Sequence, residues 1–405
     1  MTQKQGSLQS KDALKKKSGA KDSSVPVGTK VMLDDSGIAN LLGLLSQLGY
    51  QPIGPKLRDG AIVYEPISSV DDLPIGMSDE QEPGKYRVVP GTKGSYFEYV
   101  VGPTSWKKYL FPPHQKLWEA KKTGNKFDVS MPSEEAPSYA FIGVRPCELE
   151  AIKIQDRVFG YGREDHEARG IFSDPHYVER RTNALIIAVN CSRASQNCFC
   201  SSMGGSPHVK GEQGFDLAIT ELSVSPKHEF MIEVGSETGG HVLDALSYRE
   251  ARSSDLSKAD AQLRRVKASM RRKMIPDAAD VLKRNLDSSY WDKIAERCMN
   301  CANCTMSCPT CFCSTVEETT DLKGEHAERW RSWDSCFSGD FSYIHGGAIR
   351  RETKSRYRQW ITHKLSSWHE QFGTSGCVGC GRCITWCPVG IDITKEARAL
   401  RDSRK

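Results

Sequence analysis

The feature that most constrains this chain is a cysteine spacing that occurs twice near its C-terminal end. The first copy reads C-x2-C-x2-C-x3-C-P over residues 298–309, and the second copy covers residues 377–388. Three cysteines placed two residues apart can each reach a different iron of one cube, while the fourth points toward a neighbouring cube. The repeat therefore predicts two 4Fe-4S clusters held by cysteine sulfur.

In two-cluster ferredoxins, the fourth cysteine of each run binds the other cluster. The same exchange predicts a first set of Cys298, Cys301, Cys304 and Cys387 and a second set of Cys377, Cys380, Cys383 and Cys308. Gly379 lets the backbone curl around a cube, and Asn300, which tolerates left-handed backbone, stands at the same place in the first run. Structural zinc is the alternative, but it prefers two separated C-x2-C pairs with four ligands in total.

Four cysteines in the N-terminal half suggest a third site. Apolar strands are expected at 139–144 and 184–189, and Cys147 and Cys191 follow them closely. If these strands are parallel, both thiols lie at the carboxyl edge of one sheet, where α/β proteins place ligands. Cys198 and Cys200 share a loop with Cys191. The four thiols predict a third 4Fe-4S cluster, with zinc or plain buried thiols as the alternatives.

The last three cysteines, Cys311, Cys313 and Cys336, make an incomplete site. A fourth ligand could come from one of three nearby residues: Asp334, His326 or His345. Free cysteine is among the most buried residue types, so packing is the favoured interpretation of these thiols.

Alternation of strand-like and helical segments in the first 250 residues predicts an α+β protein. Strands are expected at 61–67, 139–144, 184–189, 215–222 and 229–234, and helices at 38–50 and 147–159. The expected divisions are a disordered basic tail (1–28), an N-terminal α/β-type domain with a mixed sheet (29–250), a charged helical linker (251–288) and a ferredoxin-like, mainly helical dicluster domain (289–405).

Composition narrows the classes of protein. No apolar run approaches the roughly 18 residues that a membrane span needs, and the polar, lysine-rich N-terminus lacks a secretory segment, so the cytoplasm is expected. The 15 cysteines are an odd number, and cytosolic thiols are kept reduced, which argues against a disulfide framework. Basic runs at 264–273 and 350–358 permit nucleic-acid binding, but solvated helix faces are the favoured interpretation.

Motifs for substrate chemistry are missing from the sequence. It contains no dinucleotide-binding glycine fingerprint, no Walker A motif and no nucleophile elbow, so we assign no catalytic residue. Several clusters without a substrate motif indicate a protein that passes single electrons between partners. A cluster-containing regulator that binds nucleic acid and a zinc-structured scaffold are the other classes of function.

Short sequence elements outside the cysteine runs carry a family resemblance. They include FIGVRPCELEAIKIQDRVF (141–159), NCFCSSMG (197–204), CPTCFCS (308–314), WDSCF (333–337) and SRYRQW (355–360). Together with the runs, they closely resemble the beta subunit of cytoplasmic nickel-iron hydrogenases of the sulfhydrogenase type over about residues 30–395. The electron-transfer subunit of anaerobic sulfite reductase is also similar.

The resemblance implies a role and partners. In the hydrogenase family, this subunit lies beside a flavoprotein subunit that binds FAD and NAD(P)H. It relays electrons to or from the hydrogenase small and large subunits; in the alternative family the partners would be sulfite reductase subunits. Neither a membrane nor a nucleic acid is an expected partner.

Overall fold

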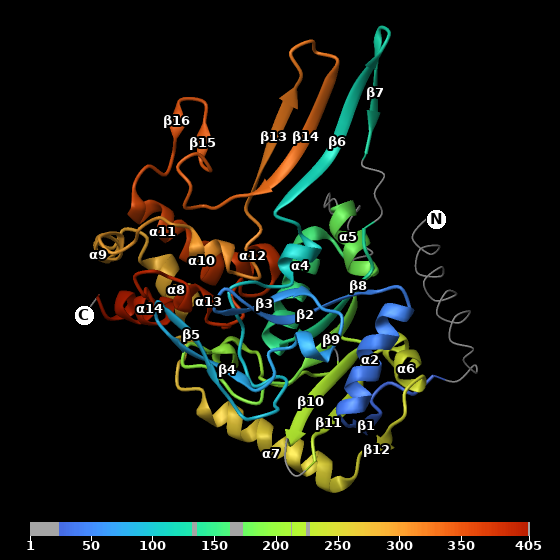
Figure 1. Ribbon diagram of the computed structural model, residues 1–405. Helices are drawn as coiled ribbons and strands as arrows, with labels where there is room; N and C mark the ends of the chain where they lie inside the picture. Colours follow the sequence, from blue (N-terminus) through green and yellow to red (C-terminus); the bar gives the residue numbers. More distant parts are fainter. Residues whose placement is uncertain (1–23, 132–135, 163–172, 212, 224–226, 404–405) are drawn as a thin grey trace.

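The computed structural model describes residues 24–131, 136–162, 173–211, 213–223 and 227–403 (Figure 1). A large mixed sheet with helices on both faces fills the N-terminal half, and short helices fill most of the C-terminal half. The tail expected at 1–28 lies mostly outside the described residues, although Val25 is buried in the core of the sheet. The predicted α+β class is confirmed.

The main sheet has eight strands in the order β12-β1-β11-β10-β9-β8-β2-β3. Its central strands β2, β8, β9 and β10 run parallel, and the outer strands pair antiparallel. The strand bounds are β1 Lys30–Leu33, β2 Gln51–Arg58, β3 Ala61–Pro66, β8 Tyr139–Val144, β9 Leu185–Val189, β10 Leu217–Ser223, β11 Glu229–Val234 and β12 Arg249–Glu250. All five strands expected from the sequence are present in this sheet.

Alternate residues of the central strands face two separate cores, as burial on both faces of a parallel sheet requires. Ile142 and Ile187 pack with helices α2 (Asp35–Gln47) and α6 (Glu237–Asp244) on one face. Phe141 and Ile186 pack on the other face with α4 (Pro146–Phe159) and α5 (Pro175–Thr182). Helices α2 and α4 correspond to the two helices expected in this half.

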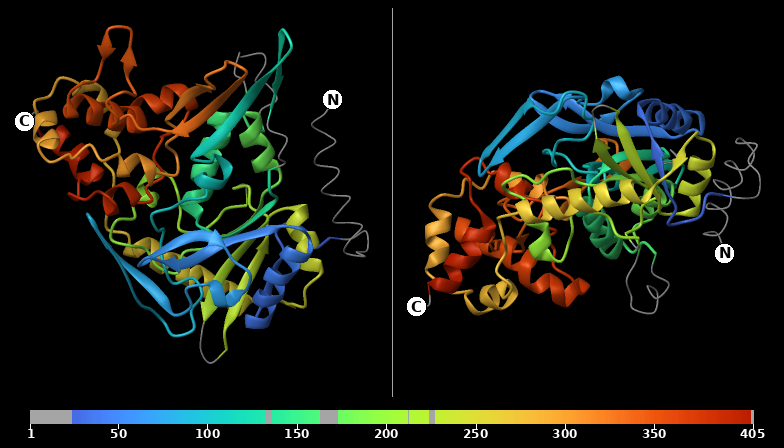
Figure 2. Two further views of the ribbon diagram at one scale, coloured as in Figure 1. Left: turned by 45° about the horizontal axis from the view of Figure 1, so that its top comes forward. Right: turned by 90° about the horizontal axis from the view of Figure 1, so that it is seen from below.

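A second sheet joins distant parts of the chain. Its order is β13-β14-β6-β7, with β6 (His114–Thr123) and β7 (Lys126–Ser130) from the N-terminal half and β13 (Ser314–Thr320) and β14 (His326–Trp333) from the C-terminal half. The strands β6 and β14 pair antiparallel, and the sheet projects from the molecule (Figures 1 and 2). The domains expected at 29–250 and 289–405 therefore share backbone hydrogen bonds.

Short helices build the rest of the C-terminal half around a core that includes Trp291, Tyr357, Trp360 and Leu400. They are α8 Ala278–Arg284, α9 Tyr290–Ala295, α10 Asn303–Met306, α11 Thr353–Thr362, α12 Trp368–Phe372, α13 Arg382–Thr385 and α14 Ile393–Asp402. A π-helical turn, His363–Ser367, connects α11 to α12. In the described part of the chain, no helix combines the length and the apolar composition that a membrane crossing needs.

Several smaller elements complete the molecule. The segment expected as a charged helical linker contains α7 (Ser253–Ser269) and α8. The remaining short elements are α3 Lys107–Leu110, the 3-10 turns η1 Val70–Asp72 and η3 Cys200–Met203, and the hairpins β4 Met77–Glu82 with β5 Lys85–Pro90 and β15 Tyr343–Ile344 with β16 Gly347–Ala348. The β4–β5 turn lies on the second cysteine run, where the Gly84 N–H donates to the Ile384 carbonyl at 3.0 Å.

A buried ion pair also ties the two halves together. Arg382 of the second cysteine run lies 2.5 Å from Glu148 in the first turn of α4, and their side chains are 0% and 1% exposed. Glu148 also accepts hydrogen bonds from the Tyr64 hydroxyl and the Trp106 indole, at 2.8 and 3.1 Å. Arg382 donates to the carbonyl oxygen of Gly102 at 2.8 Å. The pair therefore has the additional hydrogen bonds that a buried ion pair needs.

Replacing Glu148 with Gln should destabilise the protein strongly, because the buried guanidinium of Arg382 would lose its counter-charge. The expected loss is about 3 to 5 kcal/mol of unfolding free energy. Denaturant unfolding of anaerobically prepared protein, followed by circular dichroism, measures this loss.

The matched control is Glu370→Gln, which removes one partner of an exposed pair with Lys283, 2.8 Å apart. That variant should unfold at nearly the wild-type denaturant concentration, because water screens exposed pairs. Equal losses in the two variants would contradict a special role for the buried pair.

Candidate iron-sulfur sites

The cysteines of the first predicted set surround one apolar cavity. Cys298, Cys301, Cys304 and Cys387 all line it, together with core residues that include Phe337, Tyr357 and Trp360. Burial raises the pKa of the Cys298 thiol, and the nearby Cys387 raises it further. The fourth cysteine of the second run is thus a neighbour of the first run, as the exchanged arrangement requires.

The two cysteine runs repeat the same backbone conformation at matching positions. Asn300 and Ala302 have φ angles of 52° and 62°, and Gly379 and Gly381 have 68° and 82°. Left-handed backbone is expected at the two glycines and tolerated by Asn300, which donates a 2.7 Å hydrogen bond to Thr353. Ala302 was not expected there, since a Cβ in this conformation costs roughly 1 to 2 kcal/mol. Only the alignment of the two runs could have indicated it.

The second predicted set comes together around Cys308. Burial raises the pKa of Cys377 to about 12, and the neighbouring thiols of Cys380 and Cys308 contribute to this rise. Burial and the same neighbours raise the pKa of Cys383. Cys308 therefore lies near the three cysteines of the second run, as the exchanged arrangement predicts, and it also lies near Cys304 of its own run.

A buried lysine contacts this second set. The Lys364 ammonium donates to the Cys308 sulfur at 3.3 Å, to the Thr310 hydroxyl at 2.9 Å and to the Gly376 carbonyl at 3.1 Å. Within the described residues, Lys364 has no carboxylate within the 4 Å of an ion pair, so thiolate sulfur is its counter-charge. Sequence reasoning missed Lys364, because nothing in its local sequence indicates that it is buried.

The four N-terminal cysteines line one small cavity at the edge of the main sheet. Cys147 begins helix α4 after β8, Cys191 follows β9, and Cys198 and Cys200 enter the 3-10 turn η3. The strands β8 and β9 are parallel, so both loops leave the same edge of the sheet. The structure therefore brings together all four thiols of the predicted third set.

The cavity lined by the third cysteine set favours a cationic ligand. Burial raises the pKa of all four thiols, so thiolates there need positive charge close by. The buried Arg145 lowers the pKa of Cys191 in opposition to burial. Arg193 also lines the cavity, but it pairs with Asp79 at 3.2 Å. Iron would supply the charge that the arginines do not.

The second and third sets are direct neighbours in the fold. Cys380 lines the third cavity along with Gly379, and the Phe199 N–H donates to the Gly379 carbonyl at 2.9 Å. A Cβ at position 379 would lie 2.6 Å from the Cys200 nitrogen. Glycine is therefore required at position 379 by the close approach of the two loops as well as by its backbone angle.

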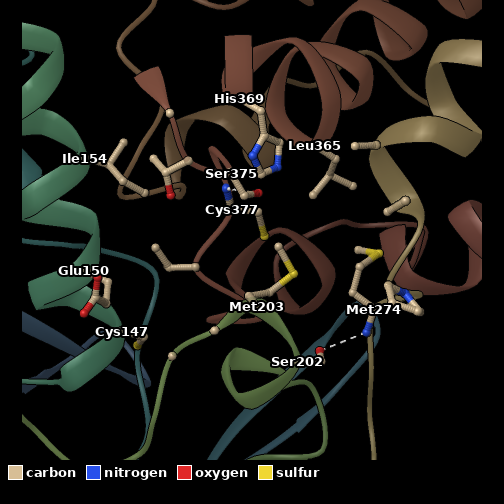
Figure 3. Close-up of a pocket in the computed structure, with 18 of the residues that line it drawn as sticks. Cys147, Glu150, Ile154, Ser202, Met203, Met274, Leu365, His369, Ser375 and Cys377 are labelled. Carbon is tan, nitrogen blue, oxygen red and sulfur yellow. Dashed lines mark hydrogen bonds between the residues drawn. The ribbon is translucent and has the colours of Figure 1, made fainter. Parts of the chain in front are cut away.

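A larger cavity of about 540 Å³ opens between the second and third sets. Figure 3 shows Cys147 on one side of this cavity and Cys377 on another, with Met203 between them. The Met274 N–H donates to Ser202 at 3.0 Å across its lower wall. One cysteine from each of these two sets is therefore next to this space.

Of the three remaining cysteines, Cys311 lies close to Cys308 of the second set, and Cys336 lies near Cys304 of the first. Cys311 and Cys308 shift each other's pKa values in opposite directions, and Cys313 and Cys336 do the same, so the members of each pair are neighbours. Of the expected fourth ligands, Asp334 is next to Cys313, but its carboxylate accepts hydrogen bonds from the Ser335 N–H and the Ser338 hydroxyl. The other two lie elsewhere: His326 is beside Glu119 and Glu328, and His345 is in the exposed turn between β15 and β16. The histidine that does line a cavity with Cys313 and Cys336 is His363, which was not anticipated.

Sulfur spacing bears on the zinc alternative. Among the described residues, three potential ligand atoms lie within 4.8 Å of one another only at Glu119, His326 and Glu328, on the projecting sheet. Tetrahedral zinc with Zn–S bonds near 2.3 Å would hold its sulfur atoms about 3.8 Å apart. The cysteine sets are spaced more widely than one zinc ion requires.

Comparison with known proteins supports iron-sulfur binding by the C-terminal half of the chain. Residues 297–391 match a family described as a 4Fe-4S dicluster domain. The chain is 27% identical over 357 residues to the sulfhydrogenase 2 subunit beta of Pyrococcus furiosus, covering 86% of this chain and 92% of that protein. The resemblance predicted from the sequence is confirmed: the chain is similar to a sulfhydrogenase beta subunit along most of its length and carries a C-terminal 4Fe-4S dicluster domain.

Proposed function

We propose that this protein is the iron-sulfur electron-transfer subunit of a hydrogenase complex. The observation that carries the proposal is the arrangement of three four-cysteine sets, each next to another. Its relative is by name one subunit of a sulfhydrogenase, which supports a multisubunit complex here too. The chain would then transfer electrons without a catalytic residue of its own.

The three sets are assigned to three 4Fe-4S clusters because each offers four cysteine sulfurs. A bound cluster takes up and releases one electron at a time. The first set is Cys298, Cys301, Cys304 and Cys387, the second is Cys377, Cys380, Cys383 and Cys308, and the third is Cys147, Cys191, Cys198 and Cys200.

The protein's own residues set the path between these sites. Cys304 and Cys308, one from each of the first two sets, belong to one run and adjoin α10. Gly379 holds the second set against the Cys200 loop. Electrons passing between the first and third sets would therefore go through the second set, which has neighbours in both.

We further propose that the partners at the two ends are a flavoprotein subunit and the small and large subunits of a nickel-iron hydrogenase. The flavoprotein would bind FAD and NAD(P)H, since this chain lacks a nucleotide-binding fingerprint. Flavin can accept a hydride and release single electrons, which the cysteine sets are suited to receive.

Cys308→Ser should damage the cluster of the second set and spare the cluster of the first. The reason is that Cys308 lies beside Cys377, Cys380 and Cys383 instead of completing its own run. Electron paramagnetic resonance of the dithionite-reduced variant is compared with two references, Cys380→Ser for the second set and Cys301→Ser for the first. A spectrum that matches Cys301→Ser would show that the fourth ligands are not exchanged.

Cys198→Ser should lower the iron content of the anaerobically purified chain by about four atoms, because the third cavity would lose one of its four ligands. Iron, acid-labile sulfide and zinc are measured together. The control is Cys336→Ser, whose sulfur is outside the three sets and whose iron content should equal that of wild type. Unchanged iron in Cys198→Ser, or a loss of zinc instead, would rule out a third cluster.

NADH or NADPH should reduce the clusters only when a separate FAD-containing flavoprotein subunit is present. Visible absorption is followed anaerobically, first with the chain and nucleotide alone and then after the flavoprotein is added. Dithionite gives the full bleaching for comparison. Rapid bleaching by nucleotide without flavoprotein would contradict the proposed relay.

A further inference from the structure

Two thiols outside the three cluster sets are held together by a hairpin. Cys313 precedes β13, Cys336 follows β14, and the two strands begin and end in register at Ser314 and Trp333. The Asp334 N–H donates to the Cys313 carbonyl at 2.9 Å, which extends the ladder by one residue. Both cysteines are free thiols. The ends of the hairpin therefore bring the two cysteines close together, and both line the same cavity.

This pair is open to small molecules. Cys313 and Cys336 are half-buried and line a surface cavity of about 290 Å³. The same cavity is lined by Phe312 and Phe341, which are apolar, and by Arg350, which can attract a carboxylate. An organic disulfide that carries carboxylates matches the chemistry of this lining.

The two thiols differ in acidity, as an attacking and a resolving thiol should. The hydrogen bond from Cys336 lowers the pKa of Cys313 to about 7, with help from the Cys336 N–H, Lys364 and Lys107. The same hydrogen bond and burial raise the pKa of Cys336. Cys313 is thus partly thiolate at neutral pH, while Cys336 keeps its proton.

A second buried lysine lies beside these cysteines. The Lys107 ammonium donates to the Cys311 carbonyl at 3.2 Å and lies 3.8 Å from the centre of the Trp333 ring. In the described part of the chain, it has no carboxylate within the 4 Å of an ion pair. Burial lowers the pKa of Lys107, and the nearby Cys311, Cys308 and Cys313 oppose this shift because thiolates would stabilise the ammonium.

The pair is connected to the second cluster set. Cys308 and Cys313 both raise the pKa of Cys311, so Cys311 lies between a predicted cluster ligand and the pair. A line of sulfur atoms therefore leads from a proposed cluster ligand, Cys308, through Cys311 to the pair at the surface. Electrons arriving at the second set have a short route to Cys313.

We propose that Cys313 and Cys336 form a reversible dithiol–disulfide couple that reduces carboxylate-bearing organic disulfides with electrons from the second cluster set. The proposal rests on the electron-transfer function proposed above. It adds a site at the surface of the chain where electrons reduce a small molecule directly, without passing to a partner subunit.

The chemistry balances as two exchanges followed by a reduction. The Cys313 thiolate attacks one sulfur of the disulfide, its S–S bond breaks, and one thiolate leaves with a mixed disulfide remaining on Cys313. Cys336 then loses its proton, attacks the Cys313 sulfur and releases the second thiolate, which leaves a Cys313–Cys336 disulfide. Two electrons, delivered singly through the second set, and two protons restore the dithiol. In total, one disulfide, two electrons and two protons give two thiols.

Oxidised glutathione is the probe, and the full chain with its clusters is the protein used. After anaerobic incubation and alkylation, peptide mass spectrometry of wild type should show a Cys313–Cys336 disulfide. Cys336→Ser should retain one glutathione on Cys313, because the resolving thiol is missing. Cys313→Ser should retain none at either position. Both variants should keep the wild-type iron content.

Coupling to the clusters is tested in the same samples. Oxidised glutathione, added after excess dithionite is removed, should abolish the reduced-cluster resonance of wild type and leave that of Cys313→Ser unchanged. Absence of the Cys313–Cys336 disulfide in wild type would overturn the proposal, and so would a loss of about four irons from either variant, since the cysteine would then be a cluster ligand. Intact, dithionite-reducible clusters without the disulfide would overturn this proposal and leave the electron-transfer function standing.

Discussion

The buried pair between Arg382 and Glu148 is the contact on which the arrangement of sites depends. Glu148 follows Cys147 directly, and Arg382 lies between Cys380 and Cys383, so one ion pair fixes a cysteine of the third set relative to two of the second. Both charges are shielded from water, so separating the two loops would leave each of them unpaired. The positions of these two sets are therefore coupled through charge as well as through packing.

The sequence predicted the elements whose signal is local. Cysteine spacing led to the first two sets, and apolar runs led to the central strands, including the loops that carry Cys147 and Cys191. These predictions rest on short-range patterns, because a strand or a cysteine run is recognisable within about ten residues. The left-handed Ala302 was missed because alanine rarely adopts that backbone.

Features that depend on contacts between distant parts of the chain could not be predicted from local sequence patterns. The domain expected at 289–405 was mainly helical, yet it contributes β13 and β14 to a sheet, and β14 pairs with β6, about two hundred residues earlier. Lys107 and Lys364 resemble ordinary surface lysines until the fold brings them against the thiols of Cys308 and Cys311. Register between remote strands and burial of single charges are set by tertiary packing, which no local pattern reveals.

The π-helical turn at His363–Ser367 has a consequence for how this region can change. A π-helical turn contains one more residue than a turn of the α-helix on either side of it. Successive residues of an α-helix are related by a rotation of about 100° about the helix axis. Lys364 and Leu365 both lie inside the turn and are both buried. Deleting one residue here would restore regular winding and rotate Lys364 away from Cys308 without replacing any side chain. The number of residues in this helix therefore controls whether the Lys364 ammonium lies beside the Cys308 sulfur. Inserting or deleting one residue can add or remove this contact in a single step.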